Sequence, residues 1–354
     1  EASAAGQRWR IPRLVHQLWM GPAEDADAGD PEPESPELRA ALGSWRRAAR
    51  RARPCPWEHR VWNRSSVRGL LAKASDPSLI DGFERLRRWP EKQKDFFMYV
   101  VLGLFGGIFI DADVIPLRPP RAWLKVAEAA FGGVAQSARL MVGLEARGTE
   151  AEARAWRWAG PVQLTAWAAA AAPGHPVLMR AADRYLRSAP PVVGALAGVH
   201  YQHSIAMGPG LLTARVDEWL WETAGIGLRH LASVRGRARA SAVGDTVVLG
   251  INGFGCGQPH SGSRPCNATK AALVQHLFFG AWKPPAWEPW AGDGEGPGRR
   301  RRRRSPGAED WRLPAMALMA HFRAAGVELP WHAIPIFFSR IVPFEPPLLP
   351  MPPL

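Results

Sequence analysis

An α/β fold, with helices flanking a twisted sheet, is the architecture that the sequence predicts. Two stretches indicate buried strands: residues 11–19 are apolar and rich in β-forming residues, and residues 108–110 form a short apolar run after two glycines. A helix is indicated just before the second strand, because residues 90–104 carry apolar side chains at helical spacing. The length of 354 residues allows one large domain of this class or two small ones.

Other elements are predicted from hydrophobic spacing and from the prolines and glycines that interrupt it. Helices are expected over residues 38–53, 65–74, 79–88, 163–172, 175–186 and 213–221, and over a stretch that ends at 274–276. Strands are expected over residues 57–63, 131–134, 140–144 and 242–249, with a last strand within 329–344. Loops are expected over residues 23–36 and 250–263, a polar surface segment over residues 151–158, and an extended surface segment in the proline-rich C-terminal tail.

Two acids follow the apolar strand at residues 108–110, and they point to cation chemistry. Asp111 and Asp113 are separated by one residue, so both side chains project to the same side of an extended backbone. Two hard oxygen donors at the carboxyl end of a strand suit a divalent cation that bridges to phosphate oxygens. The alternative is a pair of surface acids in a turn, although the end of a buried strand is a costly place for idle charge.

The balance of charge is basic, with 45 Lys and Arg residues against 32 Asp and Glu residues and a net charge of +13. Six of the positive charges form the uninterrupted run 299–304, inside a glycine- and proline-rich stretch typical of a disordered insertion. Without this run the chain is only moderately basic, which is weak evidence for nucleic acid. A basic interaction module that uses the arginine run stays as an alternative, and its binding would fall steeply with salt.

Three cysteines are too few for a framework of disulfides. Cys256 and Cys266 could bridge a short loop and leave Cys55 single, although their spacing alone does not show it. Tripeptides at Asn63 and Asn267 fit the N-glycosylation pattern, which matters only in the secretory pathway. No stretch of 18 or more apolar residues is present, and the chain begins with glutamate rather than methionine. We therefore interpret it as a luminal portion without its targeting segment.

The residues around the two acids carry a family resemblance. Residues 99–114, Tyr-Val-Val-Leu-Gly-Leu-Phe-Gly-Gly-Ile-Phe-Ile-Asp-Ala-Asp-Val, resemble the signature of glycosyltransferases with a DXD sugar-binding region. This is the family of fungal initiation-specific α-1,6-mannosyltransferases and their relatives. Further stretches match in the same order: residues 11–19, 163–167 with 173–176, 208–213 and 276–282.

The resemblance implies a single α/β domain of the GT-A type. Such a domain is Rossmann-like, with a mixed, mostly parallel sheet flanked by helices and the donor at the carboxyl ends of the strands. We therefore expect residues 1–283 to form the catalytic domain. Residues 284–310 are expected to be a disordered, arginine-rich insertion, and residues 311–354 a C-terminal extension that packs on the catalytic domain.

Three residues are assigned to donor binding by the resemblance. Trp19 would stack on the nucleotide base, with a core tryptophan as the alternative, since the chain has 17 tryptophans. Asp95 stands where the family has an acid that hydrogen-bonds the donor's sugar or ribose hydroxyls, and Trp282 belongs to the closing motif. The family usually has an arginine three residues after that acid, where this chain has Met98. One charge contact is therefore missing, and a catalytically idle nucleotide-sugar-binding protein is the alternative.

A metal site is also implied by the resemblance. Asp111, Asp113 and His276 are the expected ligands, and an imidazole suits Mn²⁺ better than Mg²⁺, which stays as the second choice. His276 could instead be structural. Transfer with retention of the α configuration allows a covalent intermediate, or a same-face attack in which the leaving phosphate takes the acceptor's proton. Because no carboxylate nucleophile stands in the matched motifs, we favour the same-face route, with Gln163 near the anomeric carbon.

Two other matched residues have simpler interpretations. His16 is expected to be a buried, hydrogen-bonded histidine rather than a catalyst. Thr213 is expected to cap the N-terminus of a helix, in preference to binding a ligand directly.

The function that these observations predict is transfer of a hexose, mannose from GDP-mannose, to a glycan hydroxyl in α linkage. Another nucleotide sugar or a lipid acceptor is the alternative. A bound Mn²⁺ would stabilise the departing diphosphate as a Lewis acid. No nucleic-acid partner is expected. The resemblance implies a type II membrane protein of the Golgi lumen, held by an N-terminal anchor that is absent from this sequence.

Overall fold

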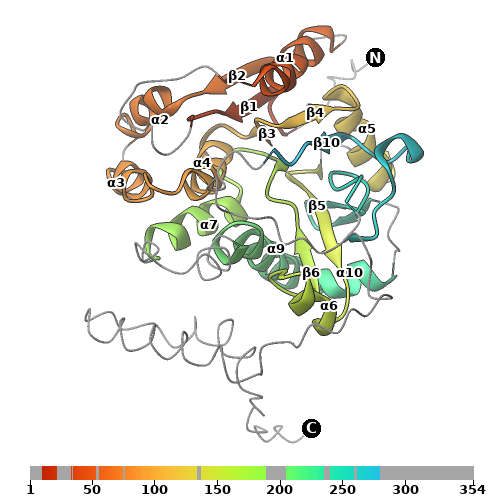
Figure 1. Ribbon diagram of the computed structural model, residues 1–354. Coiled ribbons are helices and arrows are strands. Elements are labelled where there is room, and N and C mark those ends of the chain that lie inside the picture. The colour runs from red at the N-terminus through yellow and green to blue at the C-terminus, as the bar shows by residue number, and fades with distance from the viewer. Residues whose placement is uncertain are drawn as a thin grey trace, which may run out of the picture. The chain divides into compact units, whose positions relative to one another are not determined.

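The computed structural model describes residues 10–21, 33, 35–52, 56–74, 76–133, 137–188, 205–234, 240–258 and 261–279. The main feature of these residues is one mixed sheet of eight strands (Figure 1). Its strand order is β2-β1-β3-β7-β5-β9-β8, and β6 pairs with β5 beside this path. The predicted fold class, an α/β domain with a helix-flanked mixed sheet, is confirmed.

Three parallel strands form the N-terminal part of the sheet. β1 (Leu14–Leu18) lies between β2 (Glu58–Trp62) and β3 (Gly107–Asp111), and it pairs in parallel with both. Every residue of β1 is buried, including the polar His16 and Gln17. At the carboxyl ends of the strands, Leu18 is paired with Asp111. The three strands predicted in this part of the sequence are confirmed.

Four helices accompany these strands: α1 (Pro36–Arg51), α2 (Arg64–Leu71), α3 (Ser78–Arg85) and α4 (Pro90–Phe105). α1 begins two residues before its predicted start, because the Ser35 hydroxyl accepts a hydrogen bond from the Leu38 N–H at 3.3 Å and Pro36 occupies the first turn. α4 is buried on almost every side. It therefore passes through the interior of the domain, where it can deliver polar groups to the end of β3.

The second part of the sheet contains β5 (Leu140–Arg147), β6 (Val162–Leu164), β7 (Ala168–Ala171), β8 (Ser241–Val243) and β9 (Thr246–Leu249). β7 lies between β3 and β5 and runs antiparallel to both, whereas β5 pairs in parallel with β9. Since both neighbours of β7 oppose it, β3 and β5 run in the same direction. Their carboxyl ends therefore lie at the same edge of the sheet, which positions the candidate site.

The remaining helices are α5 (Arg121–Ala130), α6 (Glu150–Ala155), α7 (Pro176–Leu186), α9 (Pro209–Ala224) and α10 (Leu228–Val234). A two-stranded sheet pairs β4 (Val114–Pro116) with β10 (Val274–His276). Two apolar cores cover the two faces of the main sheet. One joins Phe109 and Val142 to α4, α7 and α9, and the other joins Ile108 and Met141 to α1 and α5.

The helix predicted over residues 163–172 is wrong. Alanine favours helices in isolation, but β7 is a strand of four alanines between β3 and β5, and all four are completely buried. The hydrogen bonds to two neighbouring strands override the local preference. The helix predicted to end at residues 274–276 is also wrong, because these residues form β10.

Smaller differences concern turns and helix starts. The strand predicted over residues 131–134 is wrong at its described residues, which form a turn after α5. The predicted strand 242–249 is two strands, β8 and β9, joined at Gly244, whose φ of 57° suits a tight turn. The polar segment 151–158 contains α6, which Thr149 caps. The predictions for Cys55, for Trp282 and for residues 284–354 lie outside the described residues.

Two findings bear on the cellular setting. Cys256 and Cys266 form a disulfide bond, which the sequence left open. Across the part of the chain that the structure describes, no helix has the length and apolar character needed to cross a membrane.

Candidate metal and donor site

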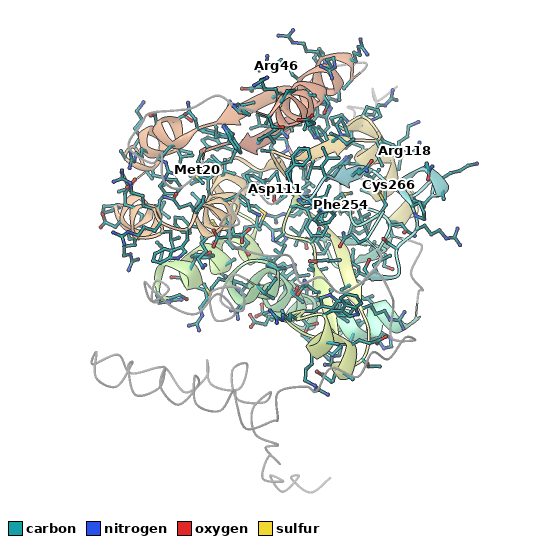
Figure 2. The ribbon with its side chains drawn as sticks, in the orientation of Figure 1. Met20, Arg46, Asp111, Arg118, Phe254 and Cys266 are labelled. Carbon is teal, nitrogen blue, oxygen red and sulfur yellow. A yellow bond between two sulfur atoms is a disulfide. The ribbon has the colours of Figure 1, made fainter. Side chains whose placement is uncertain are left out.

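Two glycines set the position of the first acid. Gly106 and Gly107 link α4 to β3 with φ values of 64° and 99°. A Cβ atom on Gly106 would lie 2.7 Å from the Ala171 carbonyl oxygen, and one on Gly107 would lie 2.5 Å from the Leu14 carbonyl oxygen. Only glycine fits this close entry into the sheet. Asp111, the last residue of β3, is thereby placed near the middle of the domain (Figure 2).

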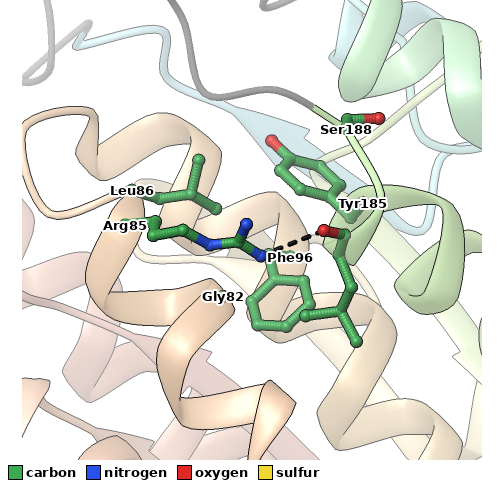
Figure 3. A pocket seen from close by; sticks show the side chains of 7 residues that line it. Gly82, Arg85, Leu86, Phe96, Tyr185 and Ser188 are labelled. Carbon is green, nitrogen blue, oxygen red and sulfur yellow. Dashed lines mark hydrogen bonds between the residues drawn. The ribbon is translucent and has the colours of Figure 1, made fainter. Parts of the chain in front are cut away.

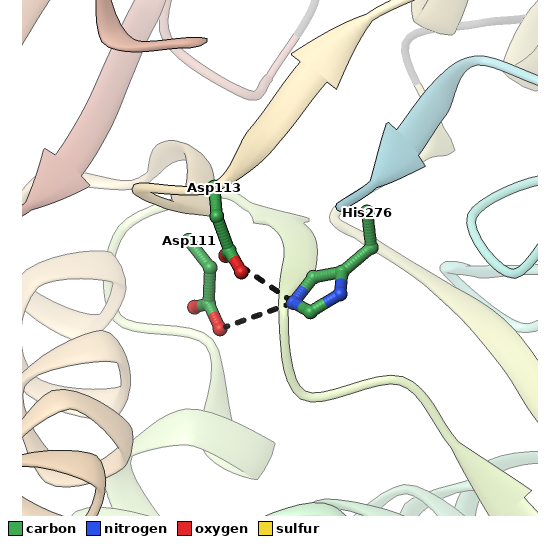
Figure 4. Close-up of side chains that lie close together, drawn as sticks. All are labelled: Asp111, Asp113 and His276. Carbon is green, nitrogen blue, oxygen red and sulfur yellow. Dashed lines mark ion pairs between the residues drawn. The ribbon is translucent and has the colours of Figure 1, made fainter. Parts of the chain in front are cut away.

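His276 reaches the two acids through β10. Because β10 pairs with β4, His276 lies opposite Val114 and next to Asp113. The His276 Nε2 atom lies 3.3 Å from Asp113 Oδ1 and 4.0 Å from Asp111 Oδ2 (Figure 4). One ligand atom from each residue can be chosen so that the three lie within 4.8 Å of one another. The structure thus gathers the three predicted ligands from two distant segments of the chain.

The donor set fits a divalent cation. Asp111 Oδ1 is buried and has no hydrogen-bond partner among the described residues, which is unfavourable for a carboxylate oxygen unless a cation binds there. Asp113 Oδ2 accepts a hydrogen bond from the Phe279 N–H at 3.1 Å, and His276 Nδ1 accepts one from the Phe278 N–H at 3.1 Å. Both side chains are therefore oriented by backbone donors. Two carboxylates and an imidazole suit Mn²⁺.

A partly buried lysine lies against the same acids. Lys94, on α4, places its Nζ atom 2.6 Å from Asp95 Oδ1 and 3.2 Å from Asp111 Oδ2, and it donates to the Ala166 carbonyl oxygen at 3.2 Å. Burial lowers the pKa of Lys94, but attraction to the two acids outweighs it and raises the pKa above its ordinary value. Lys94 is therefore a fixed positive charge at this edge of the sheet.

The charges around Asp111 have opposing effects on its protonation. Burial raises the pKa of Asp111 to about 7, and repulsion from Asp113 and Asp95 adds to the rise, whereas Lys94 opposes it. Burial likewise raises the pKa of Asp95, with Lys94 again opposing. A cation that binds these acids would stabilise their ionised form.

The positions of Asp95 and Met98 on α4 explain one departure from the family pattern. Asp95 is 5% exposed and paired with Lys94, so it reaches Asp111 through the ammonium group. Met98 is fully buried in the apolar core one turn later. The ammonium group of Lys94 therefore supplies a positive charge at this part of the site. Lys94 was not predicted from the sequence, although a lysine directly before Asp95, next to the apolar half of the helix, was a signal.

A second polar group lies on the neighbouring strands. Gln163, on β6, is 1% exposed, and its Oε1 atom accepts a hydrogen bond from the Ala159 N–H at 2.6 Å. Its amide group also hydrogen-bonds Glu145, on β5. Burial raises the pKa of Glu145 to about 7, while Gln163 and the charge of Lys94 lower it. The sequence analysis missed Glu145, which stands in no recognisable motif.

Aromatic residues form part of the surroundings. Trp19 is partly buried directly after β1, and its backbone N–H donates to the Trp62 carbonyl oxygen at 2.9 Å. Its role in base stacking stays a prediction. Trp167 donates its indole N–H to the Phe254 carbonyl oxygen at 3.0 Å, and its ring lies 5.0 Å from the His276 ring. Trp167 therefore supports the imidazole from the segment between β6 and β7.

Two residues have structural roles. His16 is fully buried, with Nε2 3.0 Å from the Gly106 carbonyl oxygen and Nδ1 accepting from the Trp62 indole at 3.0 Å. Burial lowers the pKa of His16 to about 4, so it is neutral, and the predicted structural role is confirmed. Thr213 does not cap a helix, because α9 begins four residues earlier. Its hydroxyl accepts from the Leu164 N–H at 2.9 Å and so ties α9 to β6.

A small hollow between α3, α4 and α7 lies apart from these groups. Its lining includes Gly82, Phe96 and Tyr185, and Arg85 crosses it to donate to the Leu186 carbonyl oxygen at 3.0 Å (Figure 3). Among the described residues, Asp111, Asp113 and His276 do not line this hollow. We interpret it as a packing gap between helices.

Known proteins match this chain in the same part of the sequence that carries the two acids. Residues 35–129, which include both acids, match the model of the glycosyltransferase sugar-binding region containing the DXD motif. The chain is 31% identical over 242 residues to the initiation-specific alpha-1,6-mannosyltransferase of Schizosaccharomyces pombe, covering 64% of this chain and 56% of that protein. It is 25% identical over 211 residues to the Candida albicans protein of the same name, covering 53% of each.

A further relative is the putative glycosyltransferase HOC1 of Saccharomyces cerevisiae, 25% identical over 185 residues, with 51% of this chain and 40% of that protein covered. The chain thus spans about half the length of the curated relatives it matches. A solved structure, PaToxG Glycosyltransferase, aligns with a TM-score of 0.35 at 13% identity over 61% of this chain and 72% of that one. That likeness is too low to support an argument.

The fold and the cluster define a class of protein: an α/β domain with a candidate cation site at the carboxyl edge of its sheet. Within that class, the sequence matches indicate the family. The resemblance predicted from the sequence is confirmed at residues 35–129, which match the glycosyltransferase sugar-binding region containing the DXD motif, and two of the relatives are named initiation-specific alpha-1,6-mannosyltransferases.

Proposed function

We propose that the protein is a metal-dependent, retaining glycosyltransferase that moves mannose from GDP-mannose to a glycan hydroxyl in α linkage. The observation that carries the proposal is the cluster of Asp111, Asp113 and His276, with its buried and unpartnered carboxylate oxygen among the described residues. Mannose is supported by the names of two relatives, both initiation-specific alpha-1,6-mannosyltransferases.

In this proposal Asp111, Asp113 and His276 hold Mn²⁺ or Mg²⁺, which would supply Lewis-acid stabilisation of the departing diphosphate. Lys94 supplies a second positive charge close by. Because its ammonium group is held by two acids and a carbonyl oxygen, it needs little reorganisation when negative charge develops on the leaving phosphate. This fixed cation favours an active enzyme over an idle binding protein, despite Met98.

The other donor contacts are proposed from their positions. Trp19 follows β1 at the same edge as Asp111 and would stack on the guanine base, which is worth about 1–3 kcal/mol. Asp95 would accept hydrogen bonds from ribose or sugar hydroxyls. Trp282, which lies outside the described residues, is proposed as a donor contact from the sequence resemblance alone. In the same-face route, the acceptor hydroxyl attacks the anomeric carbon while its proton passes to the leaving phosphate oxygen.

We also propose that the full-length protein works in the Golgi lumen as a type II membrane protein. The disulfide between Cys256 and Cys266 supports an oxidising compartment, since such bonds are rare in the cytosol. Asn267, in the second glycosylation tripeptide, is exposed and therefore accessible to modification.

The test is a screen of nucleotide sugars with the purified protein. GDP-mannose, UDP-glucose, UDP-galactose and UDP-N-acetylglucosamine are incubated with and without Mn²⁺, and free sugar is measured beside transfer to a mannoside and to a polyprenyl-phosphate acceptor. We expect Mn²⁺-dependent turnover of GDP-mannose and transfer to the mannoside. Binding of GDP with no turnover of any donor would establish the idle binding protein instead.

A further inference from the structure

A partly buried carboxylate, that of Glu145, lies across the sheet edge from the metal cluster. β7 separates β3 from β5, and neighbouring strands are about 4.8 Å apart, so β3 and β5 are about 10 Å apart. Glu145 lies near the carboxyl end of β5, and Asp111 ends β3. Because both strands run in the same direction, the two acids share one edge. A span of this size can accommodate one sugar residue between side chains from the two strands.

A β-bulge changes the direction of Glu145. The register between β5 and β6 shifts between Leu144 and Ala146, so Glu145 is the extra residue. Bulges interrupt the alternation of side chains and are frequent next to active sites, where they redirect a side chain. Glu145 interacts electrostatically with Lys94, whose ammonium group contacts Asp111. The carboxylate therefore faces the interior of the same site.

Gln163 fixes this carboxylate without neutralising it. The Gln163 Oε1 atom accepts from the Ala159 N–H, so the amide NH₂ group is the one that donates to Glu145. Among the described residues Glu145 has no ion-pair partner within 4.0 Å, in contrast to Asp111 and Asp95. Burial of such a carboxylate is unfavourable, and its raised pKa reflects this cost. A group kept in this state is available to a ligand.

We propose that Glu145 is a catalytic residue that contacts the transferred sugar beside its anomeric carbon. The inference rests on the proposed glycosyltransferase function. When the bond from the anomeric carbon to the diphosphate oxygen breaks, the electron pair leaves with the diphosphate and positive charge develops on the sugar ring. The negative charge of Glu145 stabilises that charge. The acceptor oxygen then forms the new bond, its proton passes to the leaving phosphate, and Glu145 forms no covalent bond.

This assignment changes the role expected for Gln163. Its amide oxygen is occupied by the Ala159 N–H and its amide nitrogen donates to Glu145, so it is a positioning residue. It acts on the sugar through Glu145.

The test compares Glu145→Gln with the parent and with Glu128→Gln, which removes an exposed carboxylate from α5. Turnover of GDP-mannose at saturating Mn²⁺ is measured beside the affinity for GDP, which lacks the sugar. We expect kcat to fall about 10²-fold in Glu145→Gln, with GDP affinity unchanged. Gln163→Ala should lower kcat less, again without a change in GDP affinity, and Glu128→Gln should match the parent. Glu145→Asp, which keeps the charge, should retain more turnover than Glu145→Gln.

Two results would overturn the inference while the proposed function stands. One is turnover by Glu145→Gln within about twofold of the parent. The other is a parallel loss of GDP affinity and turnover, because Glu145 would then act through the metal site or the fold. A parent protein that turns over none of the screened nucleotide sugars would overturn the proposed function itself.

Discussion

The two sides of the candidate site treat charge differently. The metal side, Asp111, Asp113 and His276, gathers two carboxylates and an imidazole, all partly buried. The sugar side, Glu145 and Gln163, holds one partly buried carboxylate with a neutral amide. The first suits a diphosphate that is charged throughout the reaction. The second suits a sugar that gains charge only in the transition state. Because β7 keeps the two strands apart, one sheet edge can serve both needs.

The largest expected effect is on the metal side. Asp113→Asn keeps the size of the side chain and removes its charge, so Mn²⁺-dependent turnover of GDP-mannose should fall by about 10³-fold. Without metal, the melting temperature should be equal or slightly higher, because crowding between two carboxylates is relieved. The measurement is turnover against Mn²⁺ concentration, with melting curves.

Asp81→Asn is the matched control for Asp113→Asn, since Asp81 is exposed on α3.

His276→Ala should act in the same direction as Asp113→Asn but more weakly. Since two carboxylates remain, we expect it to raise the Mn²⁺ requirement about tenfold, or about 1.4 kcal/mol. Parent-like turnover in Asp113→Asn at the parent's metal requirement would rule out the metal site.

Lys94 contacts Asp111 on the metal side and interacts with Glu145 on the sugar side, so Lys94→Met tests the link between them. The variant leaves Asp95 and Asp111 buried without a counter-charge, which should cost about 3–5 kcal/mol of stability near pH 8. The loss should be smaller near pH 5, because the pKa of Asp111 is raised to about 7 and this acid takes up a proton there. Denaturant unfolding at both pH values measures the free energy of unfolding of Lys94→Met and of the parent.

Lys73 is exposed two residues after the end of α2, and Lys73→Met is the control for Lys94→Met. Equal stability of Lys94→Met and the parent near pH 8 would mean that the buried ion pairs are not needed, and the two sides would be independent.

Trp19→Ala asks whether the metal side extends to a base-binding position. If the indole stacks on the guanine, the affinity for GDP should weaken by about 1–3 kcal/mol, with the melting temperature little changed. Calorimetric titration with GDP and Mn²⁺ measures it. A variant that loses its fold together with its affinity would favour the core alternative for Trp19.

The smallest effect concerns the stability of the sugar side. Burial raises the pKa of Glu145 from 4.5 to about 7, so the folded protein keeps a proton that the unfolded chain loses as the pH rises through this range. Stability of the parent therefore falls across this window. Glu145→Gln does not titrate, and near pH 8 it should melt about 2–4 °C above the parent, the shift that about 1 kcal/mol produces.

Near pH 5 the melting temperatures of Glu145→Gln and the parent should converge. Asp111 titrates in both proteins, so the difference between them isolates Glu145. An equal difference in melting temperature at pH 5 and pH 8 would show that the pKa of Glu145 is not raised in the folded protein.

The sequence predicted those features that depend on neighbours along the chain. The apolar run at residues 108–110 and the two glycines before it identified β3, and the acids after it identified the metal side. Pro176 at a first-turn position identified the start of α7. In each case local composition and the final structure favour the same state.

Features that depend on distant pairing were not predictable in this way. The four alanines of β7 carry no strand signal, and only their pairing with β3 and β5 makes them a strand. β10 depends on β4, more than a hundred residues earlier in the sequence. Glu145 became visible only when the register with β6 showed a bulge, because an extra residue in one strand is defined by its partner.

The bond between Cys256 and Cys266 gives the candidate cation site a dependence on maturation. The bond closes a loop that lies between β9 and β10, and the Leu273 N–H donates to the Gly253 carbonyl oxygen at 2.9 Å across the same segment. His276 is the last residue of β10. When the two thiols are oxidised to the disulfide, the chain that leads to His276 has fewer accessible conformations. We therefore expect the disulfide to form before a cation binds at the candidate site. Protein made in a reducing cytosol would start with its third ligand less restrained.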